Sequence, residues 1–338
     1  MLNLIITIPG GYCEREFKGF EHVLGEECRI ITPTNFNEIK VNLSKDNFIV
    51  SDYYFHPFFK EEVLSEEFHS FIRTLPTDRT GIYCGDSRFT FTDPTKFTNW
   101  SFIVVFASQF EDFDLEKIKG DYRIFDNIKY GRICKMDIPA IAACSYSDSS
   151  TYKREKKYDF SYIINSQVLE RKHVLDAFYK MDHLSLQLGN WPTLEDEDIQ
   201  KFIEHRKTLS VETRYEDGKA FGDEFISLNG LGKYTFTVSN GEGHFAFPMR
   251  FSEAIRSGTL SFIHQPKDPN KRIFNSDWPL CNEFLYFNNY DELLEKIEII
   301  EGCPALLKDL QHQQFRFLKK YLGKTRLKNN IKEALKFL

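Results

Sequence analysis

An arginine and a glutamate three residues apart are the side chains of this sequence best suited to bind a phosphorylated ligand. Arg250 and Glu253 belong to PMRFSEAIRSG, where Pro248 can begin a helix and Gly258 can end it. At this spacing both side chains lie on one helix face near its N-terminus, where free N–H groups and the helix dipole attract phosphate. An arginine can clamp a diphosphate, and a carboxylate can accept hydrogen bonds from ribose hydroxyls. The pair therefore predicts a nucleotide-sugar site; the alternative for Glu253 is a surface ion pair with Arg250 or Arg256.

Four further side chains are predicted to contact the same ligand. Glu242 and His244 lie in the glycine-containing loop SNGEGH that precedes the helix. There Glu242 can hydrogen-bond the sugar, and His244 can donate to a diphosphate oxygen or a sugar hydroxyl. Arg171 and Lys172 stand near the start of a predicted helix that follows a strand, where a cation can face a pyrophosphate. Two alternatives to ligand binding stay open: His244 is simply exposed in its loop, and Arg171 is a solvated charge on its helix.

Three carboxylates in the N-terminal half are candidates for the base that takes the proton of an acceptor hydroxyl. Asp52 follows FIVS and Asp86 follows GIYCG, and ligands of open α/β sheets bind beyond the carboxyl ends of strands. Glu14 is the third candidate. For each of them the alternative is a carboxylate that caps a helix or a turn.

Gly10 and Gly11 follow the first predicted strand and can bring backbone N–H groups to the donor, although a tight turn needs the same residues.

No Asp-x-Asp pair stands at the end of a predicted strand, where it could hold a nucleotide-bound metal ion. Asp196 and Asp198, in LEDEDIQ, are instead typical of the start of a helix. We therefore expect neither a metal ion nor a cofactor. Arginine, lysine and the helix dipole are expected to face the diphosphate in place of Mg²⁺.

Short apolar runs alternate with helical patterns along the chain, which predicts an α/β fold with parallel sheets covered on both faces. The polar and then basic stretch 145–157 predicts a linker between an N-terminal domain, 1–150, and a C-terminal domain, 151–338. In the first domain we expect strands Leu2–Ile8, Cys28–Thr32, Phe48–Ser51, Thr80–Cys84 and Phe102–Ala107, with helices Glu14–Leu24 and Phe58–Thr74. In the second we expect strands Phe160–Ile164, Leu184–Leu188, Thr235–Ser239, Thr259–Ile263 and Phe284–Phe287, with helices Val168–Met181, Asp196–Thr208, Phe221–Asn229, Asp291–Ile300 and Leu306–Tyr321.

The last predicted helix, Leu327–Leu338, is amphipathic. Its apolar stripe consists of Leu327, Ile331, Ala334, Leu335 and Leu338, and its basic face of Lys328, Lys332 and Lys336. One interpretation is peripheral contact with a membrane surface. The other is a helix that packs back across the two domains and keeps its basic face in water.

The segment around Arg250 resembles the donor-binding half of GT-B glycosyltransferases, and above all the exostosin-like family. That family shows a strand, a loop with glycine and proline, Arg-x-x-Glu-Ala-Ile-x-x-Gly and a hydrophobic strand. The matching residues are Arg250, Glu253, Ala254, Ile255, Gly258 and Thr259–Ile263. YDFSYIINSQVLERKHVLDAF resembles the family's strand and following helix with an arginine, here Arg171. The resemblance covers residues 158–321.

This resemblance implies two facing Rossmann-like domains, with the acceptor bound by the first and a nucleotide sugar, expected to be UDP-linked, by the second. It implies a hexosyl- or pentosyltransferase with a glycan acceptor, as in polysaccharide biosynthesis. Phe245 stands where many retaining enzymes carry the first glutamate of a Glu-x7-Glu pair, so the retaining or inverting outcome stays open. Two alternatives are a phage-type enzyme that glycosylates modified DNA bases and a non-catalytic sugar- or nucleotide-binding module of the same fold.

Charge, cysteine content and the absence of one motif argue against several other classes of protein. The formal net charge of −6 over 338 residues argues against nucleic acid as the main partner without excluding it. Seven scattered cysteines argue against a disulfide framework or a zinc site and favour a reducing compartment. LNLIITI lacks a basic leader and favours a first buried strand, so we expect a cytoplasmic protein. No Gly-x-Gly-x-x-Gly follows that strand, which disfavours a Rossmann-type oxidoreductase.

Overall fold

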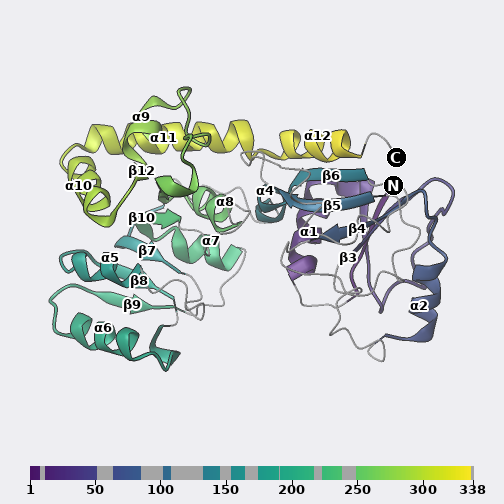
Figure 1. Cartoon of the computed structure of the whole chain (residues 1–338), viewed down its shortest axis with the longest axis horizontal. Coiled ribbons are helices and arrows are strands. Elements are labelled where there is room, and N and C mark those ends of the chain that lie inside the picture. The colour runs from purple at the N-terminus through teal and green to yellow at the C-terminus, as the bar shows by residue number, and fades with distance from the viewer. Residues whose placement is uncertain are drawn as a thin grey trace. The chain divides into compact units, whose positions relative to one another are not determined.

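The computed structural model describes residues 1–7, 12–51, 64–84, 102–107, 132–144, 154–163, 174–189, 191–216, 223–237 and 249–335. The chain divides into two compact units (Figure 1). Unit 1 comprises residues 1–145 together with 324–338, and unit 2 comprises residues 146–323. The first and the last segments of the sequence therefore belong to the same unit.

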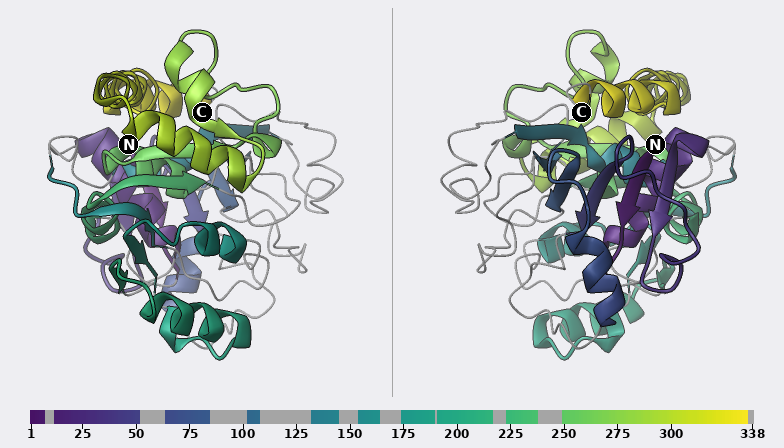
Figure 2. Two further views of the ribbon diagram at one scale, coloured as in Figure 1. Left: turned by 90° about the vertical axis from the view of Figure 1, so that its left-hand side faces the viewer. Right: turned by 90° about the vertical axis from the view of Figure 1, so that its right-hand side faces the viewer.

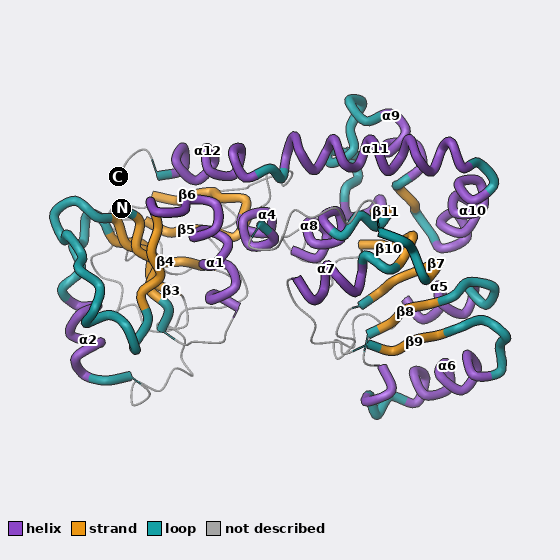
Figure 3. Tube along the Cα trace, turned by 180° about the vertical axis from the view of Figure 1, so that it is seen from behind, coloured by secondary structure: helices purple, strands orange, loops and turns teal. Residues whose placement is uncertain are grey.

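Unit 1 is built on a six-stranded parallel sheet in the order β2-β1-β3-β4-β5-β6. Purple and blue arrows in the right-hand view of Figure 2 belong to this sheet, and Figure 3 labels β3 to β6. Its strands are β1 (Leu2–Ile5), β2 (Cys28–Ile31), β3 (Asn47–Ser51), β4 (Thr80–Cys84), β5 (Phe102–Ala107) and β6 (Arg132–Asp137). Leu4 of β1 lies between Ile30 of β2 and Ile49 of β3. Continuous apolar runs such as these are expected for strands that are buried on both faces.

The described helices of unit 1 are α1 (Tyr12–Leu24), α2 (Glu66–Arg73), α4 (Ile138–Ala143) and α12 (Lys324–Ala334), with the 3₁₀ turn η1 (Gly25–Glu27). Ser65 caps α2 by accepting a hydrogen bond from the Phe68 N–H at 3.2 Å. Helices α1 and α4 cross at Gly19, where an added Cβ would lie 2.3 Å from the carbonyl oxygen of Ile141. This close crossing therefore requires glycine.

Helix α12 packs on α1 and β6 through its apolar stripe. Leu327 and Ile331 are buried in this interface. On the opposite side Lys328 and Lys332 each lie 2.7 Å from the carboxylate of Glu27, and together they lower the pKa of Glu27 to about 2. The helix is thus a packing element of unit 1, and the buried part of its stripe is not open to lipid. Within the described part of the chain, no helix combines the length and apolar character needed to cross a bilayer.

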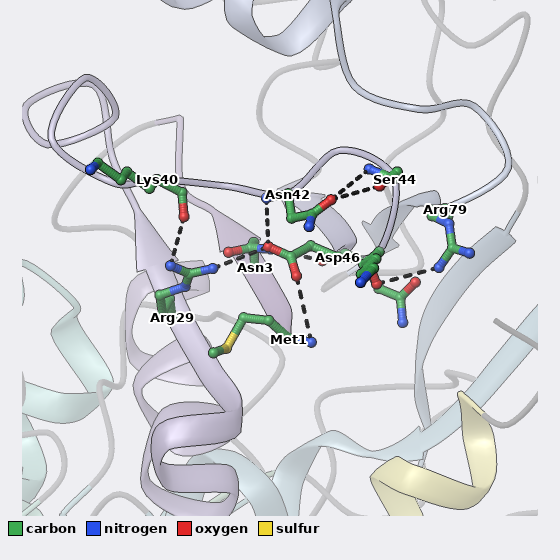
Figure 4. A network of polar contacts seen from close by, with 10 residues as sticks. Met1, Asn3, Arg29, Lys40, Asn42, Ser44, Asp46 and Arg79 are labelled. Atoms are coloured by element: carbon green, nitrogen blue, oxygen red, sulfur yellow. Dashed lines mark hydrogen bonds and ion pairs between the residues drawn. The ribbon is translucent and has the colours of Figure 1, made fainter.

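A polar network joins the segments at the amino-terminal edge of the unit 1 sheet (Figure 4). Asp46 accepts hydrogen bonds from Arg29 Nη2 at 3.1 Å and from the backbone N–H of Asn42 at 3.0 Å. Arg29 Nη1 also donates to the carbonyl of Lys40 at 2.9 Å. These bonds fix the connection from β2 to β3 at the edge opposite to the one where ligands of α/β sheets bind, so we assign them a structural role.

Unit 2 is built on a second six-stranded parallel sheet in the order β12-β11-β10-β7-β8-β9 (Figure 3). Its strands are β7 (Tyr158–Tyr162), β8 (Leu186–Leu188), β9 (Thr213–Tyr215), β10 (Gly232–Thr237), β11 (Leu260–His264) and β12 (Tyr286–Phe287). Its α-helices are α5 (Val174–Lys180), α6 (Glu197–Lys207), α7 (Asp223–Asn229), α8 (Met249–Arg256), α9 (Pro279–Phe284), α10 (Tyr290–Glu301) and α11 (Pro304–Tyr321). Two 3₁₀ turns are η8 (Trp191–Thr193) and η9 (Gln265–Lys267).

The structure departs from the predicted elements at three places. The predicted strand Phe284–Phe287 is wrong in its first half, because α9 extends to Phe284 and only Tyr286–Phe287 pairs as β12. Strands β6 and β9 have no predicted counterpart, since RICKMD carries three charged residues and TRY has only three residues. Some predicted elements lie partly outside the described residues; they are Leu2–Ile8, Phe58–Thr74, Phe160–Ile164, Val168–Met181, Phe221–Asn229, Thr235–Ser239 and Leu327–Leu338.

A buried glutamine of α11 completes the hydrogen bonding of β11. Strand β12 pairs only with Ile263 and His264. Farther along β11, Gln314 accepts a hydrogen bond from the Ser261 N–H at 3.0 Å and donates to the carbonyl of Thr259 at 2.8 Å. Its side chain is fully buried. The Gln314 side chain therefore supplies the hydrogen bonds to the β11 backbone that a neighbouring strand would otherwise supply.

Replacing Gln314 by alanine is expected to destabilise the protein by about 2–4 kcal/mol, because two buried backbone groups lose their partners. The control is Gln311→Ala on the same helix, at a half-buried side chain, for which we expect a change of about 0.5 kcal/mol or less. Chemical denaturation of the two variants measures the difference. Equal midpoints for both would contradict the assigned role.

Candidate functional site

Sheet topology locates the expected ligand site of each unit. In unit 2 the chain runs from β7 outward through β8 to β9, and then returns to β10 on the other side of β7. In unit 1 the corresponding reversal lies between β1 and β3. Ligands of open α/β sheets bind beyond the carboxyl ends of the strands at this reversal. The sites are therefore expected where β7 and β10, and β1 and β3, end.

Eight of the predicted site residues lie outside the described residues. All of them belong to segments that follow strand carboxyl ends. Gly10 and Gly11 come after β1, Asp52 after β3, Asp86 after β4, Arg171 and Lys172 after β7, and Glu242 and His244 after β10. The structure describes the side chains of Glu14 and Glu253, and for Arg250 it describes the helical backbone. The roles of all these residues stay predictions.

Helix α8 has the bounds that the sequence predicts. It begins at Met249, directly after Pro248, and the chain leaves it at Gly258 with a φ of 73°, a left-handed conformation that favours glycine. Arg250 stands in its first turn. Glu253 stands in the second turn, and only 1% of its surface is exposed. This burial rules out the alternative of a surface ion pair for Glu253, since a buried carboxylate must be held by specific partners.

The carboxyl-terminal half of α8 is fixed by hydrogen bonds to two other helices. Arg256 is buried and donates from Nη2 to the carbonyl of Leu322, which caps α11, at 2.5 Å. Ser257 donates to the carbonyl of Ala254 at 2.6 Å and accepts from Asn229 of α7 at 2.8 Å. These contacts set the position of the helix. They therefore also fix the positions of the Arg250 backbone and of Glu253.

Aromatic side chains form the core beneath the reversal point of unit 2. Tyr162, the last residue of β7, contacts Phe236 of β10 with ring centroids 4.8 Å apart. Phe178 of α5 contacts the same two rings at 5.4 and 5.8 Å. All three side chains are buried. These rings stabilise the ends of β7 and β10.

In unit 1 the carboxyl ends of β1 and β3 are joined by two hydroxyl side chains. The Thr7 N–H donates to Ser51 Oγ at 3.2 Å, and the two hydroxyl oxygens are 3.0 Å apart. Both side chains are buried. The chain continues from here into the segments that contain Gly10, Gly11 and Asp52, so their starting points are held together.

A buried carboxylate that sequence reasoning missed lies under the same edge of the unit 1 sheet. Glu16 of α1 accepts a hydrogen bond from the Tyr83 hydroxyl at 2.6 Å, and both residues are buried. Tyr83 precedes the candidate Asp86 by three residues. Glu16 and Tyr83 are 67 residues apart in sequence, and no motif connects them.

The nearby Glu14 forms an ordinary i,i+4 ion pair with Lys18 at 2.7 Å, which favours a structural role for its carboxylate.

The structure gives one negative result on metals. Among the described residues, no group of three or more His, Cys, Asp and Glu side chains could hold a metal ion. Asp196 caps α6 by accepting from the N–H groups of Asp198 and Ile199 at 3.1 and 3.3 Å, as its predicted place at a helix start requires.

No protein-family model matches this chain, and no curated protein matches it. Solved structures do. The T4 phage enzyme BGT in complex with its UDP-glucose substrate matches with a TM-score of 0.66 and 16% identity over 99% of both chains. A solved structure of the DNA-modifying enzyme β-glucosyltransferase matches with a TM-score of 0.66 and 15% identity over 99% of both chains, and T4 phage BGT in complex with UDP and Mn²⁺ is a further match.

Two further glycosyltransferases share the architecture. An O-GlcNAc transferase mutant of Thermobaculum terrenum has a TM-score of 0.54 and 10% identity, over 99% of this chain and 66% of the other. AviGT4, a glycosyltransferase of avilamycin A biosynthesis, has a TM-score of 0.51 and 12% identity, over 99% of this chain and 97% of the other. The chain has the GT-B glycosyltransferase fold, and the predicted fold class is confirmed.

Proposed function

We propose that this protein is a glycosyltransferase that binds the nucleotide sugar in unit 2 and the acceptor in unit 1. One observation carries the proposal. Helix α8 follows β10 at the reversal point of the unit 2 sheet, with Arg250 in its first turn and a buried glutamate, Glu253, in its second. A helix start of this kind suits a diphosphate, and a fixed carboxylate nearby suits the ribose hydroxyls.

The donor is proposed to be UDP-linked. The complex of T4 phage BGT with UDP-glucose supports this choice, and so does the exostosin-like resemblance of residues 158–321. We assign Glu253 to the ribose and Arg250, Arg171 and Lys172 to the diphosphate. Glu242 and His244, in the segment after β10, are assigned to the transferred sugar.

For the acceptor we propose a hydroxyl group on a modified base of DNA, in place of the glycan expected from the sequence. The support is the match to a DNA-modifying enzyme with a TM-score of 0.66, compared with 0.54 for the O-GlcNAc transferase and 0.51 for AviGT4. The ordinary bases carry no alcohol, so the acceptor base must bear an added one. The acceptor oxygen then bonds to the anomeric carbon, a carboxylate of unit 1 takes its proton, and the nucleoside diphosphate leaves.

We further propose that the diphosphate leaves without help from a metal ion, because the cationic side chains assigned to it and the start of α8 can stabilise its charge instead. Activity measured in chelator should then equal activity in untreated buffer. Added Mn²⁺ should change the rate by less than about threefold, well below the several kcal/mol that a Lewis acid supplies. Loss of turnover in chelator with recovery on Mn²⁺ would contradict this part of the proposal. Mn²⁺ is the metal ion to test, because T4 phage BGT has been solved in complex with UDP and Mn²⁺.

The test of function has two steps. Thermal-shift measurements against a panel of nucleotide sugars identify the donor, since a ligand bound only by the folded state raises the melting temperature. Mass spectrometry then follows sugar transfer to DNA with hydroxyl-bearing bases and, in parallel, to glycans. Sugar on DNA supports the proposal, and sugar on glycans alone contradicts the acceptor. Donor binding without transfer or donor hydrolysis indicates a non-catalytic module.

A further inference from the structure

Lys156 is a cation held away from water without an acidic partner. It lies near the end of the polar stretch 145–157 and belongs to unit 2. Its Nζ donates hydrogen bonds to the carbonyl of Gly230 at 2.8 Å and to the carbonyl of Gly258 at 3.1 Å. Burial, together with the nearby charge of Arg154, lowers the pKa of Lys156 to about 8. Among the residues that the structure describes, no carboxylate pairs with this ammonium group.

The two carbonyl groups that Lys156 contacts stand at the carboxyl ends of two neighbouring helices. Gly230 directly follows α7, and Gly258 follows α8 by two residues. The last carbonyls of a helix have no partner within the helix, and they carry the negative end of its dipole. One ammonium group therefore stabilises the ends of both helices, which lie side by side in Figures 1 and 3.

The ends of α7 and α8 are in direct contact beside Lys156. Asn229 of α7 donates to Ser257 Oγ at 2.8 Å, and Thr259 Oγ1 donates to the carbonyl of Asn229 at 2.7 Å. A Cβ added to Gly230 would lie 2.9 Å from the carbonyl oxygen of Ser257. Asn229, Ser257 and Thr259 are all buried. A junction packed this closely has little room to adjust, so the ammonium group helps to fix where α8 ends.

The position of the carboxyl end of α8 determines the position of its amino end, because the helix is only eight residues long. Glu253 stands five residues before Gly258 and is buried, so a displacement of the helix end moves its carboxylate as well. The first turn of α8 is the proposed diphosphate site. A cation at the carboxyl end and an anion at the amino end are both favoured by the same helix dipole.

A comparison with Arg154 argues against a role for Lys156 that is limited to tying the chain to α7. Arg154 is exposed, and it donates to the carbonyl and the hydroxyl of Ser227 in α7 at 2.6 and 3.1 Å. An exposed cation therefore already holds this stretch against α7. What Lys156 adds is the bond to the end of α8, and the ammonium group is withdrawn from water to make it.

We propose that Lys156 is a positioning residue of the nucleotide-sugar site, which acts by holding the carboxyl end of α8 so that Glu253 and the first turn meet the donor. The inference rests on the proposed function, because it requires a donor bound at the start of α8. It goes beyond that function by assigning a role in donor affinity to a residue at the opposite end of the helix. Lys156 acts on the ligand only through α8.

The test compares Lys156→Met with the matched control Arg154→Met. Each variant removes one positive charge and keeps an unbranched side chain, but only the first loses the bond to α8. We expect Lys156→Met to weaken binding of the donor found by thermal shift by about 5- to 20-fold in isothermal calorimetry, because a charged hydrogen bond at a helix end is lost. Arg154→Met should bind the donor as the wild type does.

Transfer kinetics and a conservative variant separate positioning from folding. In Lys156→Met the KM for the donor should rise by the same factor as the dissociation constant, while the KM for the acceptor stays unchanged and kcat changes by less than about twofold. Lys156→Arg keeps a cation with several N–H donors and should recover most of the donor affinity. If Lys156→Met does not fold, Lys156→Gln, which keeps N–H donors without the charge, takes its place with the same expected loss.

The outcomes distinguish this inference from the proposed function. If Lys156→Met melts at a lower temperature but binds the donor with wild-type affinity, Lys156 is only a structural cap and the inference alone is overturned. An equal loss of donor affinity in Arg154→Met would overturn it as well, because that residue bonds α7. A wild-type protein that binds no nucleotide sugar would refute the proposed function, and the inference with it.

Discussion

Replacing Glu253 by glutamine is expected to lower the affinity for the nucleotide sugar by about 10- to 100-fold. A carboxylate that accepts hydrogen bonds from ribose hydroxyls contributes roughly 1.5–3 kcal/mol for each charged bond, and the amide of glutamine keeps only part of this. Glutamine also keeps the volume of the buried side chain, so the protein should still fold. Isothermal calorimetry with the donor found by thermal shift measures the change directly.

Glu253→Ala is the harsher companion variant, because it leaves a cavity in α8, whose residues Phe251–Arg256 are buried. Its melting temperature must therefore be measured beside its affinity. The matched control is Glu298→Gln, an exposed glutamate of α10, which should bind the donor as the wild type does. If Glu253→Gln melts normally and binds the donor with wild-type affinity, the ribose role is wrong and Glu253 serves only to hold the helix.

The parts of this fold that sequence reasoning finds are those with local signals. Strands such as β3, with NFIVS, are continuous apolar runs, and α8 is delimited by Pro248 and Gly258. Parallel sheets bury such runs on both faces, so their composition alone identifies them. Strand β6 is not predicted, because its sequence mixes charged with apolar residues. Strand β9 is not predicted, because three residues are too few to show an alternating pattern of apolar and polar side chains.

The parts of the candidate site that sequence reasoning misses depend on distant contacts. Glu16 and Tyr83 meet only because α1 packs on the sheet that contains β4, and nothing in either local sequence indicates it. The burial of Glu253 is likewise set by neighbours in the fold, since a helix residue flanked by Ser252 and Ala254 has no local sign of its depth. Likewise, Gln314 shows its role only once β11 lies beside α11.

Asparagine at the position of the catalytic base is expected to reduce turnover by about 10²- to 10⁴-fold, the usual contribution of a general base. Asp86 and Asp52 are the leading candidates, because each follows the carboxyl end of a unit 1 strand by two residues or fewer. Asp52→Asn and Asp86→Asn should both keep wild-type affinity for the donor, which we assign to unit 2. The variant with the large loss of kcat identifies the base.

Glu14→Gln should retain most of its turnover, because Lys18 already engages the carboxylate on the surface of α1. The control is Asp78→Asn, an exposed aspartate in the turn before β4, which shares the charge change without lying at the carboxyl edge. Removal of the true base should also flatten the acidic limb of the pH profile of kcat/KM, since that limb reports protonation of the base in the free enzyme. A loss of kcat with an unchanged pH profile would show that the residue positions the acceptor. Wild-type turnover in both aspartate variants would exclude a base at either position and favour a retaining mechanism.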